Sequence, residues 1–454
     1  MKNYNLNISA PTDGRYSGLC EEINKIFSEH NLIKMRVKVE IEWFIFLSNQ
    51  KSIESLPKFS ESQTRKLRKI YQDFGSKESS SVKKIEDTTK HDVKAVEYFI
   101  KNKIKNNNLL NKYKEHIHIC CTSEDINNIA YSLMIKEGRD LLIYQANILQ
   151  RTMKSMGKKY KNIAMLSHTH GQPASPTTMG KEFINFYRRL DAQIDDLSNI
   201  EIKGKFNGAT GNYSAHSVTY PKVNWPNTMR KFVNSLKLEF NSHTTQIEPH
   251  DYIADLCDKI NHINSILIGF SQDVWAYISK NYFTQKNIKG EIGSSTMPHK
   301  INPINFENAE GNLGISNALL NHLATKLPVS RMQRDLSDST VLRNQGVALG
   351  HSLLGIKNIL NGLKRIQVDK IQMNIELDSH WEILAEAIQT VLRKNGKDDA
   401  YEKLKELTRG HSINQKTLRI FIESLDISKR DKKTLLSLTP HNYYGLATKL
   451  SRLK

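Results

Sequence analysis

The sequence has no apolar segment long enough to cross a membrane as a helix. Its best candidate, from Ile41 to Leu47, is short and contains Glu42, whereas a spanning helix needs about 20 mostly apolar residues. Residues 1–16 also lack the apolar stretch of a secretory signal. We therefore expect neither a membrane protein nor a secreted one, and no membrane partner.

Cysteine is scarce as well. The 454 residues include four cysteines, none of them at C-x-x-C spacing, so neither a disulfide framework nor a cysteine metal site is indicated. His168 and His170 have H-x-H spacing, but no Cys, Asp or Glu accompanies them at ligand spacing. We expect a cytoplasmic protein without a bound metal.

The sequence also lacks nucleotide-binding signatures, and two long stretches contain no proline. The chain contains neither G-x-G-x-x-G nor a P-loop motif. No proline occurs between Pro57 and Pro173, or between Pro328 and Pro440, and alternation of apolar and polar residues is nearly absent. Long spans with few turn residues favour long helices over many short strands.

Apolar residues recur every three or four positions in three segments, which is the pattern of a helix with one buried face. These segments are 181–200, 251–281 and about 347–366. We predict an all-α, three-part fold: an N-terminal helical domain (1–111), a central domain with a bundle of long helices (112–364) and a C-terminal helical domain (365–454). The glycine-rich segment 204–216 is a candidate hairpin that interrupts the helices.

The formal net charge is +19, from 66 basic and 47 acidic side chains. A basic surface is compatible with nucleic-acid binding. However, stretches such as 101–115 place lysines among asparagines and do not form an arginine-rich segment with interleaved aromatics. We therefore favour lysines on solvated helix faces over a dedicated nucleic-acid partner. A small anionic substrate would also benefit from a positive field.

The segment GEIGSSTMPHKINPINFEN, residues 290–308, has the composition of a catalytic lid. Its glycines allow hinge motion and its prolines stop helix propagation. Ser294 and Ser295 supply paired hydroxyls, and Lys300 and Asn302 supply a cation and an amide. The alternative is an ordinary polar loop between helices.

The segment SHTHGQPAS, residues 167–175, is a second candidate. Thr169 and Gln172 flank His170 and would be able to fix its tautomer, while Gly171 and Pro173 end any helix there. The alternative is a structural histidine satisfied by backbone groups.

Two further segments look like helix starts that would favour anions. His91 and Asp92 precede an apolar stripe, and Thr122 and Ser123 precede two acidic residues. Simple capping by Asp92 is the more common use of the first segment, and capping alone would also explain the second.

Arginines and hydroxyls gather in RMQRDLSDSTVLR, residues 331–343. Arginine is suited to bidentate contacts with carboxylate or phosphate. A surface helix with charge pairs to Asp335 and Asp338 is the alternative. The motifs DGRY (13–16) and TQIEPHD (245–251) are weak when taken alone.

Taken together, these motifs resemble a known family. GSSTMPHKIN, residues 293–302, matches every fixed position of the pattern G-S-S-x-M-P-x-K-x-N of the fumarase/aspartase superfamily. Within that superfamily, the ordered set of segments most resembles the bacterial adenylosuccinate lyases. The set is DGRY, HDVKAVEYF, CTSEDINN, THGQP, TQIEPHDY, the lid, RDLSDSTVLR and the tail segment YEKLKELTRG (401–410).

The resemblance implies an all-α homotetramer in which each active site draws on three chains. It also implies that fumarate is eliminated from two small-molecule substrates without a cofactor. Adenylosuccinate would give AMP, and the succinyl-carboxamide ribotide SAICAR would give AICAR.

The resemblance also implies roles for individual residues. Ser294 would be the base and His170 the acid. The succinyl part would contact Thr122, Ser123, Gln246, Lys300 and Asn302, and the phosphate end Arg15, Tyr16, Ser339 and Arg343, with His91, Asp92 and Arg334 nearby. The remaining substrate-binding positions would be Lys90, Ser295, Ile301, Asn308, Thr340, Val341 and Leu342.

Two positions depart from the family pattern. His168 stands where relatives often carry arginine, and Lys90 where they often carry asparagine. As a hypothesis, Lys300 and amides of the lid would stabilise the Ser294 alkoxide, because a neutral serine is a poor base.

Three alternatives stay open. One is another fumarate-releasing lyase, such as argininosuccinate lyase, although its substrate lacks the phosphate that DGRY and DSTVLR are expected to bind. The others are an inactive scaffold, which the intact Ser294, His170 and Lys300 argue against, and a nucleic-acid-binding protein.

Overall fold

The computed structural model describes residues 7–286, 288, 290, 293–397, 402 and 413–452. The tail segment 401–410, apart from Glu402, lies outside the described residues. The chain divides into two compact units. Unit 1 comprises Met1–Ala146, Gln193–Ser265 and Gly311–Lys357, and unit 2 comprises Asn147–Ala192, Ile266–Glu310 and Asn358–Lys454. The predicted three-part division at residues 111 and 364 stays a prediction.

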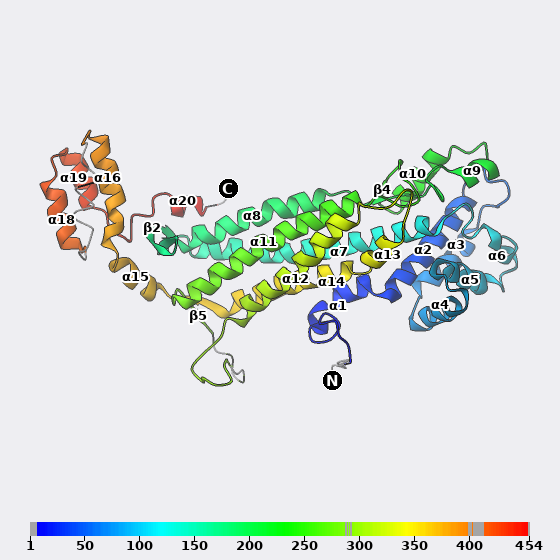
Figure 1. Cartoon of the computed structure of the whole chain (residues 1–454), viewed down its shortest axis with the longest axis horizontal. Coiled ribbons are helices and arrows are strands. Elements are labelled where there is room, and N and C mark those ends of the chain that lie inside the picture. Colours follow the sequence, from blue (N-terminus) through cyan, green and yellow to red (C-terminus); the bar gives the residue numbers. More distant parts are fainter. Residues whose placement is uncertain are drawn as a thin grey trace. The chain divides into compact units, whose positions relative to one another are not determined.

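The fold is all-α, as predicted (Figure 1). Five long helices have residues in both units: α7 (Ser123–Lys159), α8 (Met179–Asn199), α11 (Asp251–Ser279), α12 (Ile304–Lys326) and α14 (Gln345–Arg365). The periodicity located α8, α11 and α14 to within two residues at each end. None of the described helices is long and apolar enough to cross a membrane.

Shorter helices make up most of the remainder. Those in unit 1 are α1 (Ser17–Phe27), α2 (Glu29–Ser48), α3 (Glu61–Gln72), α4 (Ser76–Thr89), α5 (Asp92–Ile104), α6 (Asn108–Lys112), η1 (Lys114–His116), α9 (Ser214–Thr219), α10 (Trp225–Ser235) and α13 (Ser337–Leu342). Those in unit 2 are α15 (Lys370–Asp378), η2 (Trp381–Leu384), α16 (Ala385–Lys394), α18 (Gln415–Ser424), α19 (Lys429–Leu436) and α20 (Ala447–Leu450).

The described strands form three two-stranded sheets. β1 (Ala164–Thr169) pairs antiparallel with β2 (Gln172–Thr178), and β5 (Phe283–Gln285) with β6 (Ile366–Val368). β3 (Lys203–Gly204) pairs in parallel with β4 (Glu239–Phe240). The predicted hairpin at 204–216 is therefore wrong: its first residue pairs with a distant strand, and 214–219 is helix α9.

Unit 1 is held together by aromatic packing and by buried hydrogen bonds between long helices. The rings of Trp43 and Phe206 lie 4.8 Å apart, centroid to centroid, in its core. Asn264 of α11 donates through Nδ2 to Ser316 Oγ of α12 at 3.1 Å, and Ser352 Oγ of α14 donates to Asn264 Oδ1 at 2.7 Å. These bonds fix the register of α11, α12 and α14, because a shift would leave buried polar groups unpaired.

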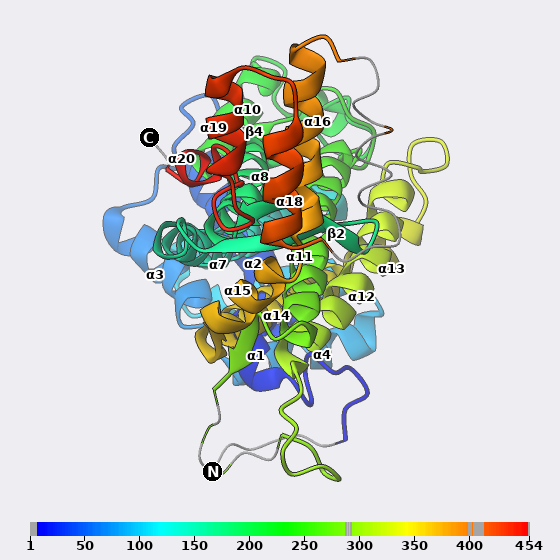
Figure 2. The same cartoon turned by 90° about the vertical axis from the view of Figure 1, so that its left-hand side faces the viewer.

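Unit 2 has a separate apolar core around its C-terminal helices. Figure 2 shows α16, α18 and α19 side by side, and Ile388, Leu418 and Leu435 from these helices are buried in one cluster. Leu166 of β1 belongs to the same cluster and is fully buried. The base of the β1–β2 hairpin is thus anchored in the C-terminal core.

Candidate active site

The predicted site residues fall in both units. Those of unit 2 are His170, Ser294, Ser295, Lys300, Ile301, Asn302 and Asn308. Those of unit 1 are Arg15, Tyr16, Lys90, His91, Asp92, Thr122, Ser123, Gln246, Arg334, Ser339, Thr340, Val341, Leu342 and Arg343.

His170 lies at the exposed tip of the β1–β2 hairpin. Thr169 pairs with Gln172, which leaves His170 and Gly171 as a two-residue turn with φ of 55° and 72°. Two positive φ values are characteristic of a type I′ hairpin turn. The segment is therefore a strand–turn–strand rather than the end of a helix. Hydrogen bonds from Thr169 or Gln172 to the imidazole, suggested by the sequence, are not found among the described residues.

His168, on the strand that leads to this turn, is partly buried between charges. Its Nε2 lies 3.0 Å from Lys280 Nζ and 3.3 Å from Glu376 Oε1. Burial, reinforced by the positive charge of Lys280, lowers the pKa of His168, although Glu376 opposes the shift. His168 therefore stays neutral at a pH where an ordinary histidine begins to take up a proton, and its contacts support the hairpin.

Ser294 lies in a loop that folds back on itself. Its Oγ accepts hydrogen bonds from Met297 N at 3.1 Å and Thr296 N at 3.4 Å. A Cβ on Gly293 would lie 2.4 Å from the carbonyl oxygen of Lys300, so the close approach of the two loop strands requires glycine. Gln285 Nε2 donates to the Ile301 carbonyl at 2.6 Å and ties the loop to β5.

Backbone N–H groups that point at a hydroxyl favour its ionised form. The amide part of our hypothesis for Ser294 is thus supported by the geometry. Lys300 is exposed and makes no ion pair within the described part of the chain, so its contribution stays a prediction. Ser295 is exposed and Asn302 half-buried in the same loop, and Asn308 of α12 accepts a hydrogen bond from Asn358 Nδ2 at 2.9 Å.

In unit 1, His91, Asp92 and Arg343 come together. His91 is the N-cap of α5, since its Nδ1 accepts from Lys94 N at 3.2 Å. The expected capping by Asp92 is therefore wrong, because Asp92 is the first helical residue and its carboxylate pairs elsewhere. Its Oδ2 lies 2.8 Å from Arg36 Nη2 and 3.7 Å from Arg343 Nη2.

Electrostatics keep Asp92 ionised. Burial raises its pKa, but Arg36 and the backbone N–H of Val93 outweigh burial, and the pKa lies below the usual range. Arg343 also binds Glu29 through Nη1 at 2.6 Å. The adjacent Lys90 adopts a left-handed φ of 54° as the C-cap of α4, a conformation that asparagine accepts more readily than lysine.

Arg15 and Tyr16 lie at the start of α1. Tyr16 is the N-cap residue of this helix, and the guanidinium carbon of the exposed Arg15 lies 5.8 Å from the centre of the Tyr16 ring. The arginine is thus available to a phosphate at the surface of unit 1.

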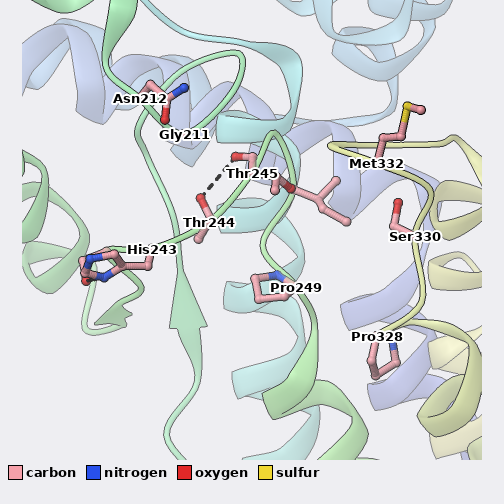
Figure 3. Close-up of a pocket in the computed structure, with 11 residues that line it drawn as sticks. Gly211, Asn212, His243, Thr244, Thr245, Pro249, Pro328, Ser330 and Met332 are labelled. Atoms are coloured by element: carbon pink, nitrogen blue, oxygen red, sulfur yellow. Dashed lines mark hydrogen bonds between the residues drawn. The ribbon is translucent and has the colours of Figure 1, made fainter.

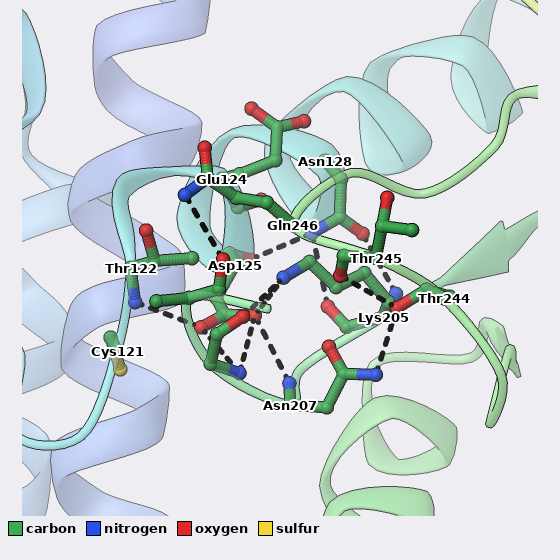
Figure 4. A network of polar contacts seen from close by, with 12 residues as sticks. Cys121, Thr122, Glu124, Asp125, Asn128, Lys205, Asn207, Thr244, Thr245 and Gln246 are labelled. Carbon is green, nitrogen blue, oxygen red and sulfur yellow. Dashed lines mark hydrogen bonds and ion pairs between the residues drawn. The ribbon is translucent and has the colours of Figure 1, made fainter. Parts of the chain in front are cut away.

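Thr122 and Ser123 begin helix α7 beside a buried ion pair (Figure 4). Asp125 and Lys205 are fully buried, with 2.8 Å between Oδ1 and Nζ. Asp125 also accepts hydrogen bonds from the backbone N–H groups of Thr122, Asn207 and Gly208. Removing one partner of such a pair typically costs about 3–5 kcal/mol, so this contact firmly joins the start of α7 to segment 204–213.

Segment 204–213 also forms a hydrogen bond with the side chain of Gln246. Gln246 Nε2 donates to the Ala209 carbonyl at 3.0 Å, and its Oε1 accepts from Arg334 Nη1 at 3.2 Å. Arg334 Nη2 lies 3.3 Å from Glu124 Oε2. The structure therefore brings Gln246 and Arg334 together, beside the helix start that carries Thr122 and Ser123.

Helix α13 carries the remaining predicted contacts of unit 1: Ser339, Thr340, Val341 and Leu342. Leu342 is buried, whereas Thr340 is exposed. The three arginines of segment 331–343 do not converge. Arg331 pairs with Asp335, Arg334 with Glu124, and Arg343 with Glu29 and Asp92.

A pocket of about 480 Å³ lies beside the segment that carries Gln246 (Figure 3). Its wall consists mainly of hydroxyl, amide and apolar groups. The lining residues are Gly211, Asn212, Ser242, His243, Thr244, Thr245, Ile247, Pro249, Pro328, Ser330 and Met332. Gly211 has a φ of 79°, and a Cβ there would lie 2.2 Å from the Thr244 carbonyl oxygen. Glycine is therefore required for this wall to form.

One group of buried side chains has the composition of a metal site. Ligand atoms of Glu124, His250 and Asp338 lie within 4.8 Å of one another. Arg334 already places a positive charge against Glu124, which disfavours a divalent cation by like-charge repulsion. The absence of a metal stays a prediction.

Sequence reasoning missed several of these groups. Asp125, Lys205, Glu124, His250 and Asp338 were not assigned to the site, although each lies within or near a motif already singled out. A paired acidic dipeptide at a helix start and a lysine in a glycine-rich segment were the available signals. Neither signal identifies its partner, because the partners are far apart in sequence.

Comparison with known proteins identifies the family. Residues 14–315 match the family model described as Lyase, and residues 330–444 match that described as Adenylosuccinate lyase C-terminal. The chain is 48% identical over 457 residues to adenylosuccinate lyase of Escherichia coli (strain K12), covering 100% of both chains. It is 49% identical over 447 residues to that of Legionella pneumophila (strain Corby), covering 98% of each.

The chain belongs to the adenylosuccinate lyase family. It is therefore a lyase, and the resemblance noted in the sequence motifs is confirmed. The lyase fold is also seen in solved structures with low identity. A fumarate lyase from Mesorhizobium sp. BNC1 matches with a TM-score of 0.75 at 16% identity, covering 95% of this chain and 96% of that one. The 3-carboxy-cis,cis-muconate lactonizing enzyme from Pseudomonas putida matches with 0.74 at 18% identity, covering 94% of each.

Proposed function

We propose that this chain eliminates fumarate from adenylosuccinate, giving AMP, and from SAICAR, giving AICAR. Ser294 Oγ takes the proton from the carbon next to a succinyl carboxylate. The electron pair of that C–H bond is first delocalised onto the carboxylate and then forms the carbon–carbon double bond of fumarate as the C–N bond breaks. His170 delivers a proton to the departing nitrogen, which completes the acid–base pair.

The observation that carries this proposal is the environment of Ser294. Two backbone N–H groups point at its Oγ, and this favours the alkoxide that a serine base requires. Removal of the proton places a second charge on the carboxylate, so donors must surround it. We assign that role to Lys300, Asn302, Thr122, Ser123 and Gln246.

The phosphate end of the substrate is assigned to unit 1. Arg15, Tyr16, Ser339 and Arg343 supply a charged and hydroxylated surface, with His91, Asp92 and Arg334 nearby. The positive net charge of +19 would attract a substrate that carries a phosphate and two carboxylates. We place this activity in the cytoplasm, since all four cysteines are free thiols.

Fumarate release tests the proposal. Purified protein mixed with adenylosuccinate is expected to release fumarate and AMP, measured by absorbance and by chromatography of the nucleotide. Argininosuccinate serves as the parallel control and is expected to give none. Release from argininosuccinate alone would refute the assigned phosphate contacts, and release from neither would refute the activity.

We also propose a homotetramer whose active sites combine residues of three chains. Large apolar side chains are exposed on three of the long helices: Tyr144 on α7, Trp275 on α11 and Ile315 on α12 have exposed fractions of 59%, 46% and 51%. Exposed aromatic and aliphatic groups on long helices are typical of subunit interfaces. Sedimentation equilibrium is expected to give the mass of four chains, and a monomeric mass at micromolar concentration would contradict the proposal.

A further inference from the structure

Three buried titratable side chains have no part in the proposed proton transfers. Glu124 lies in the first turn of α7, His250 directly precedes α11, and Asp338 lies in α13. Their exposed fractions are 2%, 2% and 3%. All three belong to unit 1, as do the predicted substrate contacts Gln246 and Arg334.

Each of the three has a polar atom without a hydrogen bond among the described residues. These atoms are Glu124 Oε1, His250 Nε2 and Asp338 Oδ2, and the last two lie 3.6 Å apart. Groups buried in this way are normally hydrogen-bonded. The three side chains thus form one buried cluster, with their ligand atoms within 4.8 Å of one another.

The following inference rests on the proposed function. We propose that Glu124 is a positioning residue that fixes the orientation of Arg334 and Gln246 for substrate binding. We further propose that His250 and Asp338 set the protonation of Glu124. The chain of contacts is continuous. Glu124 Oε2 lies 3.3 Å from Arg334 Nη2, and Arg334 Nη1 donates to Gln246 Oε1 at 3.2 Å.

Four charged or titratable side chains from different segments act on Glu124. Arg334, His250 and Lys205 favour its ionised form, and Asp338 opposes it. Burial is the largest effect and raises the pKa of Glu124 to about 7. For Asp338, burial also raises the pKa, but His250 and Arg334 outweigh it and hold the pKa below its usual range. Near neutral pH, Glu124 therefore takes up and releases a proton.

The ionised and protonated forms of Glu124 have different consequences. Above pH 7 the carboxylate holds the Arg334 guanidinium by a charge-assisted contact, which is stronger than a contact to a neutral acid. Below pH 7 this hold weakens, and both Arg334 and Gln246 lose their fixed orientation. KM should therefore rise as the pH falls, while kcat changes less.

The test is the KM of Glu124→Gln for adenylosuccinate between pH 6 and pH 8, with the full-length protein. Glutamine mimics the protonated acid, so KM at pH 8 is expected to rise about tenfold and to lose its dependence on pH. Glu42→Gln is the matched control, because Glu42 also binds an arginine, Arg68, through Oε1 at 2.8 Å. The control should keep the wild-type KM profile, including any contribution from titration of the substrate.

Two neighbouring variants separate positioning from a general loss of structure. Asp338→Asn removes a negative charge, so the midpoint of the KM profile should move to lower pH. His250 favours the ionised form of Glu124, so His250→Asn should move the midpoint to higher pH; asparagine suits the φ of 65° at this position. Circular dichroism checks that each variant is folded.

The outcomes distinguish this inference from the proposed function. If wild-type protein releases no fumarate, the function itself fails. If wild-type protein is active but the KM of Glu124→Gln equals that of wild type at pH 8, or keeps its pH dependence, the positioning role is refuted. If the midpoint of the KM profile does not move in either folded neighbour variant, the proposed effect of His250 and Asp338 on the protonation of Glu124 is refuted.

Discussion

Replacing Ser294 by alanine is expected to lower kcat for adenylosuccinate by about a thousandfold while substrate binding is retained. Alanine removes the oxygen that accepts hydrogen bonds from the backbone N–H groups of Thr296 and Met297. The carbon acid then loses its positioned base, whereas Lys300 and the contacts of unit 1 remain. Steady-state fumarate release gives kcat, and equilibrium binding of adenylosuccinate gives affinity.

The neighbouring hydroxyl supplies a matched control. Ser295 is exposed in the same loop, and its predicted role is substrate binding. Ser295→Ala should therefore act mainly on KM and leave kcat much less affected. A larger fall in kcat for Ser295→Ala than for Ser294→Ala would reverse the assignment of the base. Near-normal kcat in both variants would exclude this pair from proton abstraction.

Replacing His170 by asparagine is the second variant with a large expected effect, a fall in kcat of about a hundredfold or more. Asparagine accepts the left-handed backbone of the turn, where φ is 55°, so the hairpin is expected to persist. The departing nitrogen then lacks a positioned proton donor. Steady-state fumarate release gives kcat, and circular dichroism checks that the variant is folded.

His168→Gln is the control for this variant. Because the pKa of His168 is lowered by burial and by Lys280, this side chain is not the proton donor near neutral pH. His168→Gln is expected to keep a kcat much closer to that of wild type than His170→Asn does. A larger fall in kcat for His168→Gln than for His170→Asn would move the role of the acid from position 170 to position 168.

The regular part of the fold was predictable because its signal is local. Apolar residues at helical spacing located α8, α11 and α14, whose buried faces are set by residues within one segment. The β1–β2 hairpin was not recognised, since Pro173 and Pro176 lie in β2 and proline argues against a central strand. In an isolated two-stranded hairpin both strands are edges, and that argument does not hold.

The hairpin predicted at 204–216 was wrong because the glycines of this segment serve tertiary contacts. The glycines of 204–216 suggested a hairpin, but Gly211 packs against the Thr244 carbonyl and Gly208 donates to Asp125. Both contacts join segments that are distant in sequence. The predicted site residues were taken from motifs, whereas the buried contacts near them, Asp125 with Lys205 and Glu124 with His250 and Asp338, depend on tertiary proximity. No local pattern encodes such pairs.

The turn at His170 places two independent demands on one residue. The backbone there is left-handed, which only glycine and a few polar residues such as asparagine and aspartate adopt readily, while the proposed chemistry needs an imidazole. A substitution that suits the turn therefore tends to remove the acid, and few residues can do both. A replacement at position 170 must therefore suit a left-handed backbone and supply a proton donor at the same time.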